Sequence, residues 1–507
     1  MYKQELRRIS PEQAGISSAR IQKLISDLEK ETEMHGIMIA RGTDVIAESW
    51  WAPYTSELPH ILHSLGKTYV GTGIGLAEAE GLLNVDERIV DIFAQDLRQL
   101  GLTPSPLQEK LTIRHLLTMS NGMGRQPRLN EHIIENYLRE PVIYEPGTRF
   151  MYNTAGTSLL CEILRRRAGK QISAYMTEKL FLPMGIETDK LLWMQYKNGL
   201  DASPGIATTA ENNLRLGMLY LQDGCWNGKR YLSREWVRAA TSCQIDNAGT
   251  SPDAEACVGY GYQIWMCSLP GSFRFDGGHG QFVVVYPRQQ MVISLNQSAG
   301  SFGAAARVLE LVLAFLKELD SAPVGSLPEN PKELDGLAAF LRSRALRPGT
   351  VTPLPADLHR LDGIYHTLRG DLNIYPETRV DNKENWDSVF YDLEDTDIRC
   401  VSIRTEEAGF VEITFNHYTV LKVRLDGVQE IVESKGAMPS YHKTCSTGYF
   451  DGPDTLVVHT RWIQTCPDRT MTFRRYAGRL IINAVLNTLH DFCPETVYHL
   501  ELVPADI

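Results

Sequence analysis

The chain has 507 residues, too many for one ordinary domain, so two or three domains are expected. Its hydrophobic content of 43% and charged content of 22% are normal for a soluble globular protein. The net charge of −11 argues against a nucleic-acid partner, because phosphates are bound by basic patches.

The sequence lacks the signals of an exported, membrane-spanning or metal-dependent protein. The first eight residues have no apolar segment behind their charges, which argues against a secretory signal. No window approaches about 18 uncharged apolar residues, so no membrane span is expected. The nine cysteines are scattered without a CxxC pair, and no HExxH-type metal spacing occurs. We therefore expect a cytoplasmic protein with reduced thiols, no metal and no cofactor, whose oligomeric state the sequence leaves open.

The N-terminal part of the chain predicts a helix followed by a hairpin. Residues 17–31 carry apolar side chains at 21, 24, 25 and 28, which is the spacing of an amphipathic helix. Residues 36–40 and 44–50 predict a β-hairpin joined through a glycine-containing turn. Residues 85–235 are predicted to be mostly helical, with proline-rich loops between the helices.

Strands return after the helical region. Residues 281–287 and 290–296 predict a second hairpin, and a long helix is expected over 301–319. The predicted order is a helix, a hairpin, a helical region, a second hairpin and a final helix. This order predicts an α/β (α+β) domain over residues 1–320. Its antiparallel β-sheet is flanked by helices and carries an all-helical subdomain over about 85–235.

The last third of the chain has a different pattern. Residues 321–357 are rich in proline and predict a linker with one short helix over about 332–343. From residue 358 onward, short alternating segments separated by turn residues predict a β-rich domain, a barrel or a sandwich, over 358–507. The predicted strands are 389–393, 398–404, 410–415, 419–425 and 455–460.

Ser64-Leu65-Gly66-Lys67 carries the strongest chemical signal. It places a hydroxyl and an amine three residues apart, and such residues share one face of a helix. The run of small residues from Thr68 to Leu83 predicts a helix whose internal glycines indicate tight packing against its neighbours. The SxxK pattern alone is weak, since Ser440-Tyr441-His442-Lys443 repeats it in a polar stretch.

A serine hydroxyl becomes a useful nucleophile near neutral pH when a base takes its proton. Lys67 can be that base if it is buried, because burial disfavours the ammonium form and lowers the pKa of a lysine. The N–H group of Ser64, at the start of a helix, could stabilise an oxyanion. Tyr152 could share the proton, although taken alone it is more typical of a packed aromatic residue.

Several segments together resemble the serine β-lactamase and penicillin-binding-protein-like superfamily, in its class C β-lactamase, D-aminopeptidase and family VIII esterase branch. The resemblance covers about residues 8–318. The segments that carry it are Pro11–Ser18, Ser64–Lys67, Leu111–Gly122, Phe150–Thr154, Leu180–Ile186, Gly224–Ser233 and Gly259–Trp265. It implies a covalent acyl-enzyme mechanism in which Ser64 attacks a carbonyl carbon while Lys67 and Tyr152 form the base system.

The chain departs from the family pattern where the substrate would be held. The family's Tyr-x-Asn is Tyr152-Asn153-Thr154 here, and a threonine hydroxyl lacks the two donors of an amide. No Lys-Thr-Gly precedes the strand at 281–287; the matching region contains Asp276, Gly277 and His279, and Arg274 or His279 is the candidate for the missing polar group. We expect Thr154, Asp276, Gly277 and His279 to contact substrate, although His279 alone is more typical of a structural histidine, and the glycine is equally consistent with a close backbone approach.

Three functions remain open at the level of the sequence. The first is a serine hydrolase acting on a small-molecule ester or amide, or a peptide-like substrate. The second is a β-lactamase or D-amino-acid peptidase, which the altered substrate-holding motifs weaken. The third is a catalytically weak binding or scaffold protein on the same fold, against which the Ser64, Lys67 and Tyr152 set argues.

Overall fold

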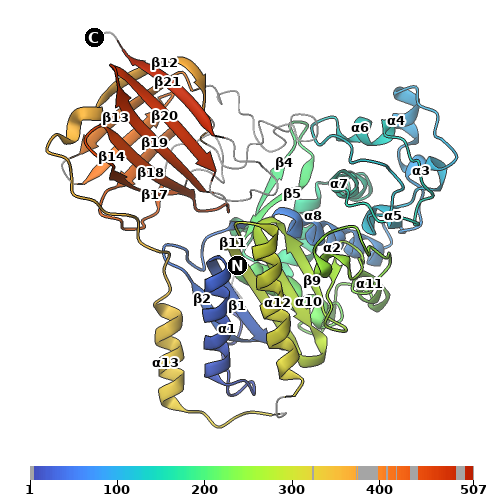
Figure 1. Cartoon of the computed structure of the whole chain (residues 1–507). Coiled ribbons are helices and arrows are strands. Elements are labelled where there is room, and N and C mark those ends of the chain that lie inside the picture. Colours follow the sequence, from blue (N-terminus) through green and yellow to red (C-terminus); the bar gives the residue numbers. More distant parts are fainter. Residues whose placement is uncertain are drawn as a thin grey trace.

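The computed structural model describes residues 5–321, 325–372, 374, 398–406, 409–417, 419–433, 443–466, 468–486 and 497–505. The predicted strand at 389–393 and the serine of the second SxxK copy, Ser440, lie outside these residues. Within them the chain forms a mixed domain of helices and antiparallel sheet, followed by a β-barrel (Figure 1).

The centre of the first domain is a six-stranded antiparallel sheet in the order β2-β1-β11-β10-β9-β8. Both predicted hairpins are confirmed as parts of it. The strands are β1 (Glu33–Arg41), β2 (Asp44–Trp50), β8 (Trp265–Met266), β9 (Phe273–Gly277), β10 (Gln281–Tyr286) and β11 (Met291–Ser298).

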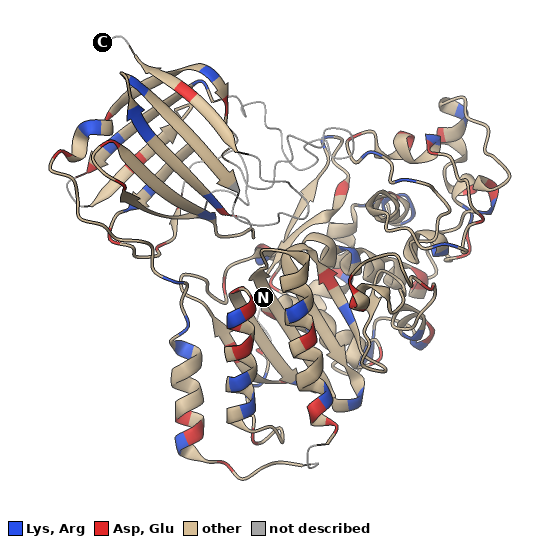
Figure 2. Ribbon diagram, in the orientation of Figure 1, with Lys and Arg blue, Asp and Glu red and all other residues tan. Residues whose placement is uncertain are grey.

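Both faces of this sheet are covered. Helices α1 (Ser18–Glu31) and α12 (Phe302–Leu319) lie on one face, and α13 (Pro331–Arg342) lies beside α1 (Figure 1). The segment predicted as a linker is therefore partly packed, since Leu337 of α13 belongs to the same buried core as α1. Figure 2 shows residues of both charge signs along these three helices.

The opposite face of the sheet packs against α2 (Gly66–Ala79) and α10 (Ala210–Leu221). Neighbouring strand residues separate into the two cores: Val283 and Val285 join the core with α2 and α10, whereas Val284 joins the core with α1 and α12. This division follows from the alternation of side chains along a strand. Both sets are apolar because helices cover both faces.

Beyond α2 the chain forms the helical subdomain on one side of the sheet (Figure 1). Its main helices are α3 (Ile89–Ile92), α4 (Ala94–Gln99), α5 (Ile113–Leu117), α6 (Ile133–Arg139), α7 (Thr154–Ala168), α8 (Ile172–Met176), α9 (Leu182–Met184) and α11 (Arg234–Ala240).

The prediction of a mostly helical segment at 85–235 missed four strands within it. Two of them, β4 (Leu192–Gln195) and β5 (Asp201–Thr208), form a three-stranded sheet with β3 (His60–Ile61). All eight residues of β5 are buried, so the strand lacks the alternation of apolar and polar residues that sequence reasoning depends on. The other two, β6 (Cys225–Trp226) and β7 (Lys229–Arg230), form a short hairpin.

The C-terminal domain is a closed barrel of nine strands, which decides between the predicted barrel and sandwich. The sheet runs β15-β14-β13-β12-β21-β20-β19-β18-β17 and closes by parallel pairing of β15 with β17. Closure removes exposed sheet edges. The strands are β12 (Gly363–Asp371), β13 (Cys400–Glu406), β14 (Phe410–Phe415), β15 (Thr419–Arg424), β17 (Lys443–Phe450), β18 (Thr455–Trp462), β19 (Asp468–Tyr476), β20 (Arg479–Leu486) and β21 (Tyr498–Pro504), while β16 (Val432–Glu433) pairs outside the ring with β17.

Among the described residues, no helix is long and apolar enough to cross a membrane. The same residues contain no group of three or more histidine, cysteine, aspartate or glutamate side chains arranged to hold a metal ion.

Candidate active site

Ser64 lies in a short 3₁₀ turn, η1 (His63–Leu65), that leads directly into α2. Lys67 follows in the first turn of α2, and its Nζ donates a hydrogen bond to Ser64 Oγ at 2.9 Å. The structure thus brings the hydroxyl and the amine of the SxxK pattern into direct contact.

Helix α2 is buried along most of its length because its glycines let other elements approach closely. A Cβ atom on Gly66 would lie 2.8 Å from the carbonyl oxygen of Ser203, and one on Gly75 would lie 2.4 Å from the ring of Trp236. The helix ends at Ala79 rather than at Leu83. This close packing leaves Lys67 only 1% exposed.

Tyr152 reaches the same point from the loop that precedes α7. Asn153 caps this helix by accepting a hydrogen bond from the backbone N–H of Gly156 at 2.9 Å. Tyr152 lies beside Ser64: burial raises the pKa of its phenol, and an interaction with the Ser64 side chain opposes that rise. Its ring lies 4.8 Å from Lys67 Nζ and stacks on Trp265 at 5.8 Å between ring centroids.

Burial sets the proton affinities of this cluster. Desolvation lowers the pKa of Lys67 to about 7, against an opposing effect of the nearby Asp276 carboxylate. Desolvation also raises the pKa of Tyr152 well above its usual value. Near neutral pH, therefore, Lys67 is substantially present as the free amine, while Tyr152 keeps its proton.

The end of β9 forms the other wall beside Ser64. A Cβ atom on Gly277 would lie 2.0 Å from the carbonyl oxygen of Leu62 and 3.1 Å from the backbone nitrogen of Leu65. The glycine is thus a close approach of two backbones, one of which carries Ser64. Only a residue without a side chain fits here.

Asp276 precedes this glycine and forms an ion pair with Arg274, whose Nε lies 2.7 Å from the carboxylate. Arg274 is buried and also donates to the carbonyl oxygen of Met266 at 2.9 Å. Burial raises the pKa of Asp276, and the Arg274 guanidinium opposes that rise. An ion pair between a carboxylate and a buried guanidinium therefore lies at the end of β9, next to Gly277.

The two remaining predicted residues lie around this cluster. His279 is buried with a left-handed φ of +61°, and its ring packs against that of His63 at 5.1 Å. Thr154 is the buried first residue of α7; its backbone N–H donates to Gln126 Oε1 at 2.7 Å and its carbonyl accepts from Ser203 at 3.5 Å. These contacts tie the first residue of α7 to the loop that carries Gln126 and to β5.

Two residues around the site were missed individually by the sequence reasoning. Trp265 supports the ring of Tyr152, and the buried Gln263 accepts a hydrogen bond from Thr157 at 2.8 Å while its backbone carbonyl accepts one from Thr68 at 2.8 Å. Both lie in the Gly259–Trp265 segment, which carries part of the family resemblance. That match was the sequence signal that could have identified them.

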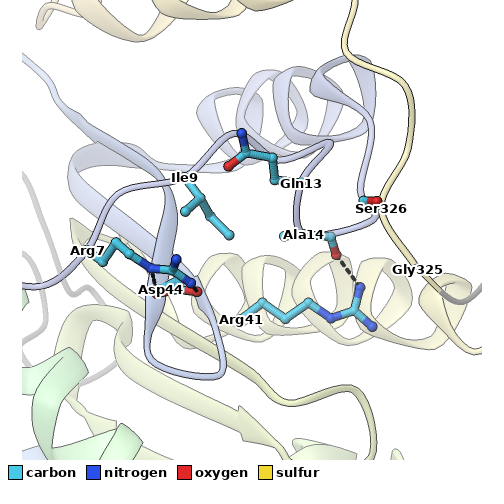
Figure 3. A pocket seen from close by; sticks show the side chains of 8 residues that line it. All are labelled: Arg7, Ile9, Gln13, Ala14, Arg41, Asp44, Gly325 and Ser326. Atoms are coloured by element: carbon cyan, nitrogen blue, oxygen red, sulfur yellow. Dashed lines mark hydrogen bonds and ion pairs between the residues drawn. The ribbon is translucent and has the colours of Figure 1, made fainter.

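A separate pocket of about 440 Å³ lies between the N-terminal loop, the β1–β2 turn and residues 325–326 (Figure 3). In it Arg7 pairs with Asp44, and Arg41 donates to the carbonyl oxygen of Ala14 and to Gln289. Its lining includes none of the predicted site residues, and both guanidinium groups are used by protein partners.

Comparison with known proteins identifies the family of the first domain. A sequence model described as Beta-lactamase matches residues 21–314, more than half of the chain. The chain is 24% identical over 293 residues to the 6-aminohexanoate-dimer hydrolase of Paenarthrobacter ureafaciens, a match that covers 53% of this chain and 74% of the relative.

Similar solved structures include a protein assigned as a 6-aminohexanoate-dimer hydrolase from Bacillus anthracis, with 18% identity and a TM-score of 0.50 over 63% of this chain and 89% of that chain. A penicillin-binding protein homologue from Caulobacter crescentus matches with 13% identity and a TM-score of 0.48 over 58% and 97% of the two chains. The chain belongs to the Beta-lactamase family.

Proposed function

We propose that this chain is a serine hydrolase that cleaves a small ester or amide through an acyl-enzyme on Ser64. The observation that carries the proposal is the 2.9 Å contact between Ser64 Oγ and the buried Lys67 Nζ, with the Tyr152 ring 4.8 Å from the same amine. These are the nucleophile, base and proton-sharing groups that acyl transfer requires.

In the first step, Ser64 Oγ attacks the carbonyl carbon of the substrate and its proton passes to Lys67 Nζ. The resulting oxyanion needs backbone donors, for which the N–H of Ser64 and the adjacent Gly277–Gly278 corner are the candidates. Tyr152 carries the proton onward to the leaving group as the carbon–heteroatom bond breaks. In the second step, water attacks the acyl carbon and gives a proton to Lys67 Nζ; the bond from that carbon to Ser64 Oγ breaks, Oγ takes the proton back, and the carboxylic acid leaves.

The substrate we propose is a small ester or amide. The named activity of the Paenarthrobacter ureafaciens relative, hydrolysis of a 6-aminohexanoate dimer, supports small acyl compounds as substrates. A β-lactamase is less well supported, because Thr154 replaces the family's asparagine and no Lys-Thr-Gly precedes β10. The contact of Ser64 with Lys67 likewise favours catalysis over a binding or scaffold role.

The test compares the wild type with Ser64→Ala, using a fluorophosphonate probe and a p-nitrophenyl ester. We expect the wild type to be labelled and to release p-nitrophenol, and Ser64→Ala to do neither. Ser440→Ala, the same change in the second SxxK copy, is the matched control and should behave as wild type. Equal labelling of the wild type and Ser64→Ala would contradict the proposal.

A further inference from the structure

The barrel touches the catalytic domain beside the nucleophile. Residues 463–466 follow β18 at the end of the β18–β19 hairpin and are buried; we call them the barrel tip. Ile463 belongs to the core built by α1, α12 and one face of the main sheet. Cys466 joins Ile61 and Ala207 in a small apolar cluster between the two domains.

Two hydrogen bonds through backbone carbonyls fasten the barrel tip in this position. The N–H of Ile61 donates to the carbonyl of Gln464 at 2.9 Å, and Ser298 Oγ donates to the carbonyl of Cys466 at 2.8 Å. Ile61 lies three residues before Ser64. The barrel tip is therefore hydrogen-bonded to the segment that leads into the nucleophile.

The Cys466 thiol lies between the two walls of the site. Its Sγ is 3.5 Å from Nε2 of His63, the residue immediately before Ser64. Gln281 Nε2 donates to the same sulfur at 3.3 Å, and Gln281 begins β10 directly after the corner formed by Gly277 to Gly280. The thiol thus links the turn that carries Ser64 with the strand end that faces it.

The turn needs this kind of support. His63 has a φ of +49°, a left-handed conformation that costs free energy for a residue with a side chain and persists only where the surroundings impose it. On one side Gly278 packs against the His63 ring, with a Cβ position 3.5 Å away. On another side the ring meets the barrel tip.

A buried ion pair attaches the strand end just before the barrel tip to the first domain. Arg461 on β18 is 8% exposed and forms a two-point ion pair with Glu33 on β1, at 2.9 and 2.6 Å. Burial alone would raise the pKa of Glu33, but its interactions with His35 and Arg461 hold that pKa well below the usual value. On the barrel side, Asp468 pairs with His459. A charge buried without its partner is strongly unfavourable. The ion pair between Arg461 and Glu33 therefore favours the docked arrangement of the two domains.

We propose that the barrel is a positioning element of the active site, whose tip holds the His63–Leu65 turn so that Ser64 faces Lys67. Cys466 is a positioning residue in this scheme and takes no part in the chemical steps. The inference rests on the proposed function, because it concerns the efficiency of the same acylation.

The test is Cys466→Ala in the full chain, which removes the sulfur but keeps the backbone contacts of the barrel tip. We expect acylation by the fluorophosphonate and kcat for the ester to fall about tenfold, with KM changed less than about twofold, because a small misplacement of a nucleophile acts on the reaction more than on binding. Cys466→Ser should recover most of the rate, since a hydroxyl can donate and accept at the same position.

Cys400→Ala is the matched control. Cys400 is a buried cysteine on β13 of the same barrel, and its Sγ lies 3.1 Å from His417 Nε2. It should acylate at the wild-type rate. Equal acylation of the wild type and a folded Cys466→Ala would overturn this inference alone. Absence of Ser64 labelling in the wild type would contradict the proposed function and, with it, this inference.

Arg461→Met gives a second test if Cys466→Ala does not fold. It leaves Glu33 without its ion-pair partner, and we expect acylation per folded molecule to fall. Adding Glu33→Gln, which removes the unpaired charge, should restore part of the rate. A folded Arg461→Met that acylates as fast as the wild type would also overturn the inference.

Discussion

The catalytic proposal depends at the residue scale on the environment of one amine. Lys67 is buried within α2, and the pKa of its side chain is lowered to about 7 mainly because the ammonium form is desolvated. A lysine in water would be almost fully protonated at this pH and could not take a proton from Ser64. The burial of α2 thus turns a common residue into a usable base.

The pH dependence of acylation follows from this value. Since the free amine is the active form, log kcat/KM for a neutral ester should rise with slope 1 below pH 7 and level off above it. A pH–rate profile between pH 5 and 9 measures this rise, which is the acidic limb of the profile. An acidic limb near pH 10, the usual range of lysine, would contradict the assignment of Lys67 as base.

The same shift affects stability with a definite sign. The folded pKa of Lys67 lies below the usual value of 10.5, so the unfolded chain binds more protons between about pH 7 and 10.5. The contribution of this group to the free energy of unfolding therefore rises with pH across that window and disfavours the folded state below it.

Asp276→Asn should move the acidic limb to lower pH. The carboxylate raises the pKa of Lys67, and its removal also leaves the Arg274 guanidinium without its partner. Both changes disfavour the ammonium form, so the pKa of Lys67 should fall further. The pH–rate profile of the variant measures the shift, with Asp223→Asn as a control in the helical subdomain; an unchanged or raised limb would count against a role for Asp276 beside Lys67.

At the scale of elements, α2 is held by close contacts that only glycine permits. Gly75 lies against Trp236, and Gly73 lies against Ile172 and Met176. These contacts explain why a helix rich in glycine, which is intrinsically unfavourable, follows Ser64. The position of Lys67 depends on them.

Gly75→Ala should lower the free energy of unfolding by about 1–3 kcal/mol, because the added methyl group would lie 2.4 Å from the Trp236 ring. Gly336→Ala in α13 is the matched control. Its methyl group enters open space, so it should stabilise by about 0.5–1 kcal/mol through helix propensity. Thermal unfolding of the two variants measures the contrast, and changes of the same sign would contradict it.

At the scale of the whole molecule, the barrel packs on the catalytic domain through a buried ion pair and a hairpin tip. Arg461 and Glu33 lie 428 residues apart in the chain yet form a two-point contact. Ile463 enters the core of the first domain. The C-terminal domain, for which the sequence offered no role, is therefore physically joined to the segment that carries Ser64.

Local sequence patterns by themselves determined much of the secondary structure of this protein. The apolar spacing of residues 17–31, the two hairpins, the helix at 301–319 and the β-rich C-terminal third depend on short-range periodicity, and the structure contains them. The SxxK spacing also determined the contact of Ser64 with Lys67, because residues three apart on a helical turn meet.

Only the tertiary structure decided the rest. It decided that β5 is a strand, that the β-rich domain closes as a barrel, and that Tyr152, Asp276 and Cys466 gather around one turn from distant parts of the chain. These features depend on contacts between residues far apart in sequence, and on burial, which local periodicity does not encode. The lowered pKa of Lys67 has the same origin, since desolvation exists only once the chain has folded around the amine.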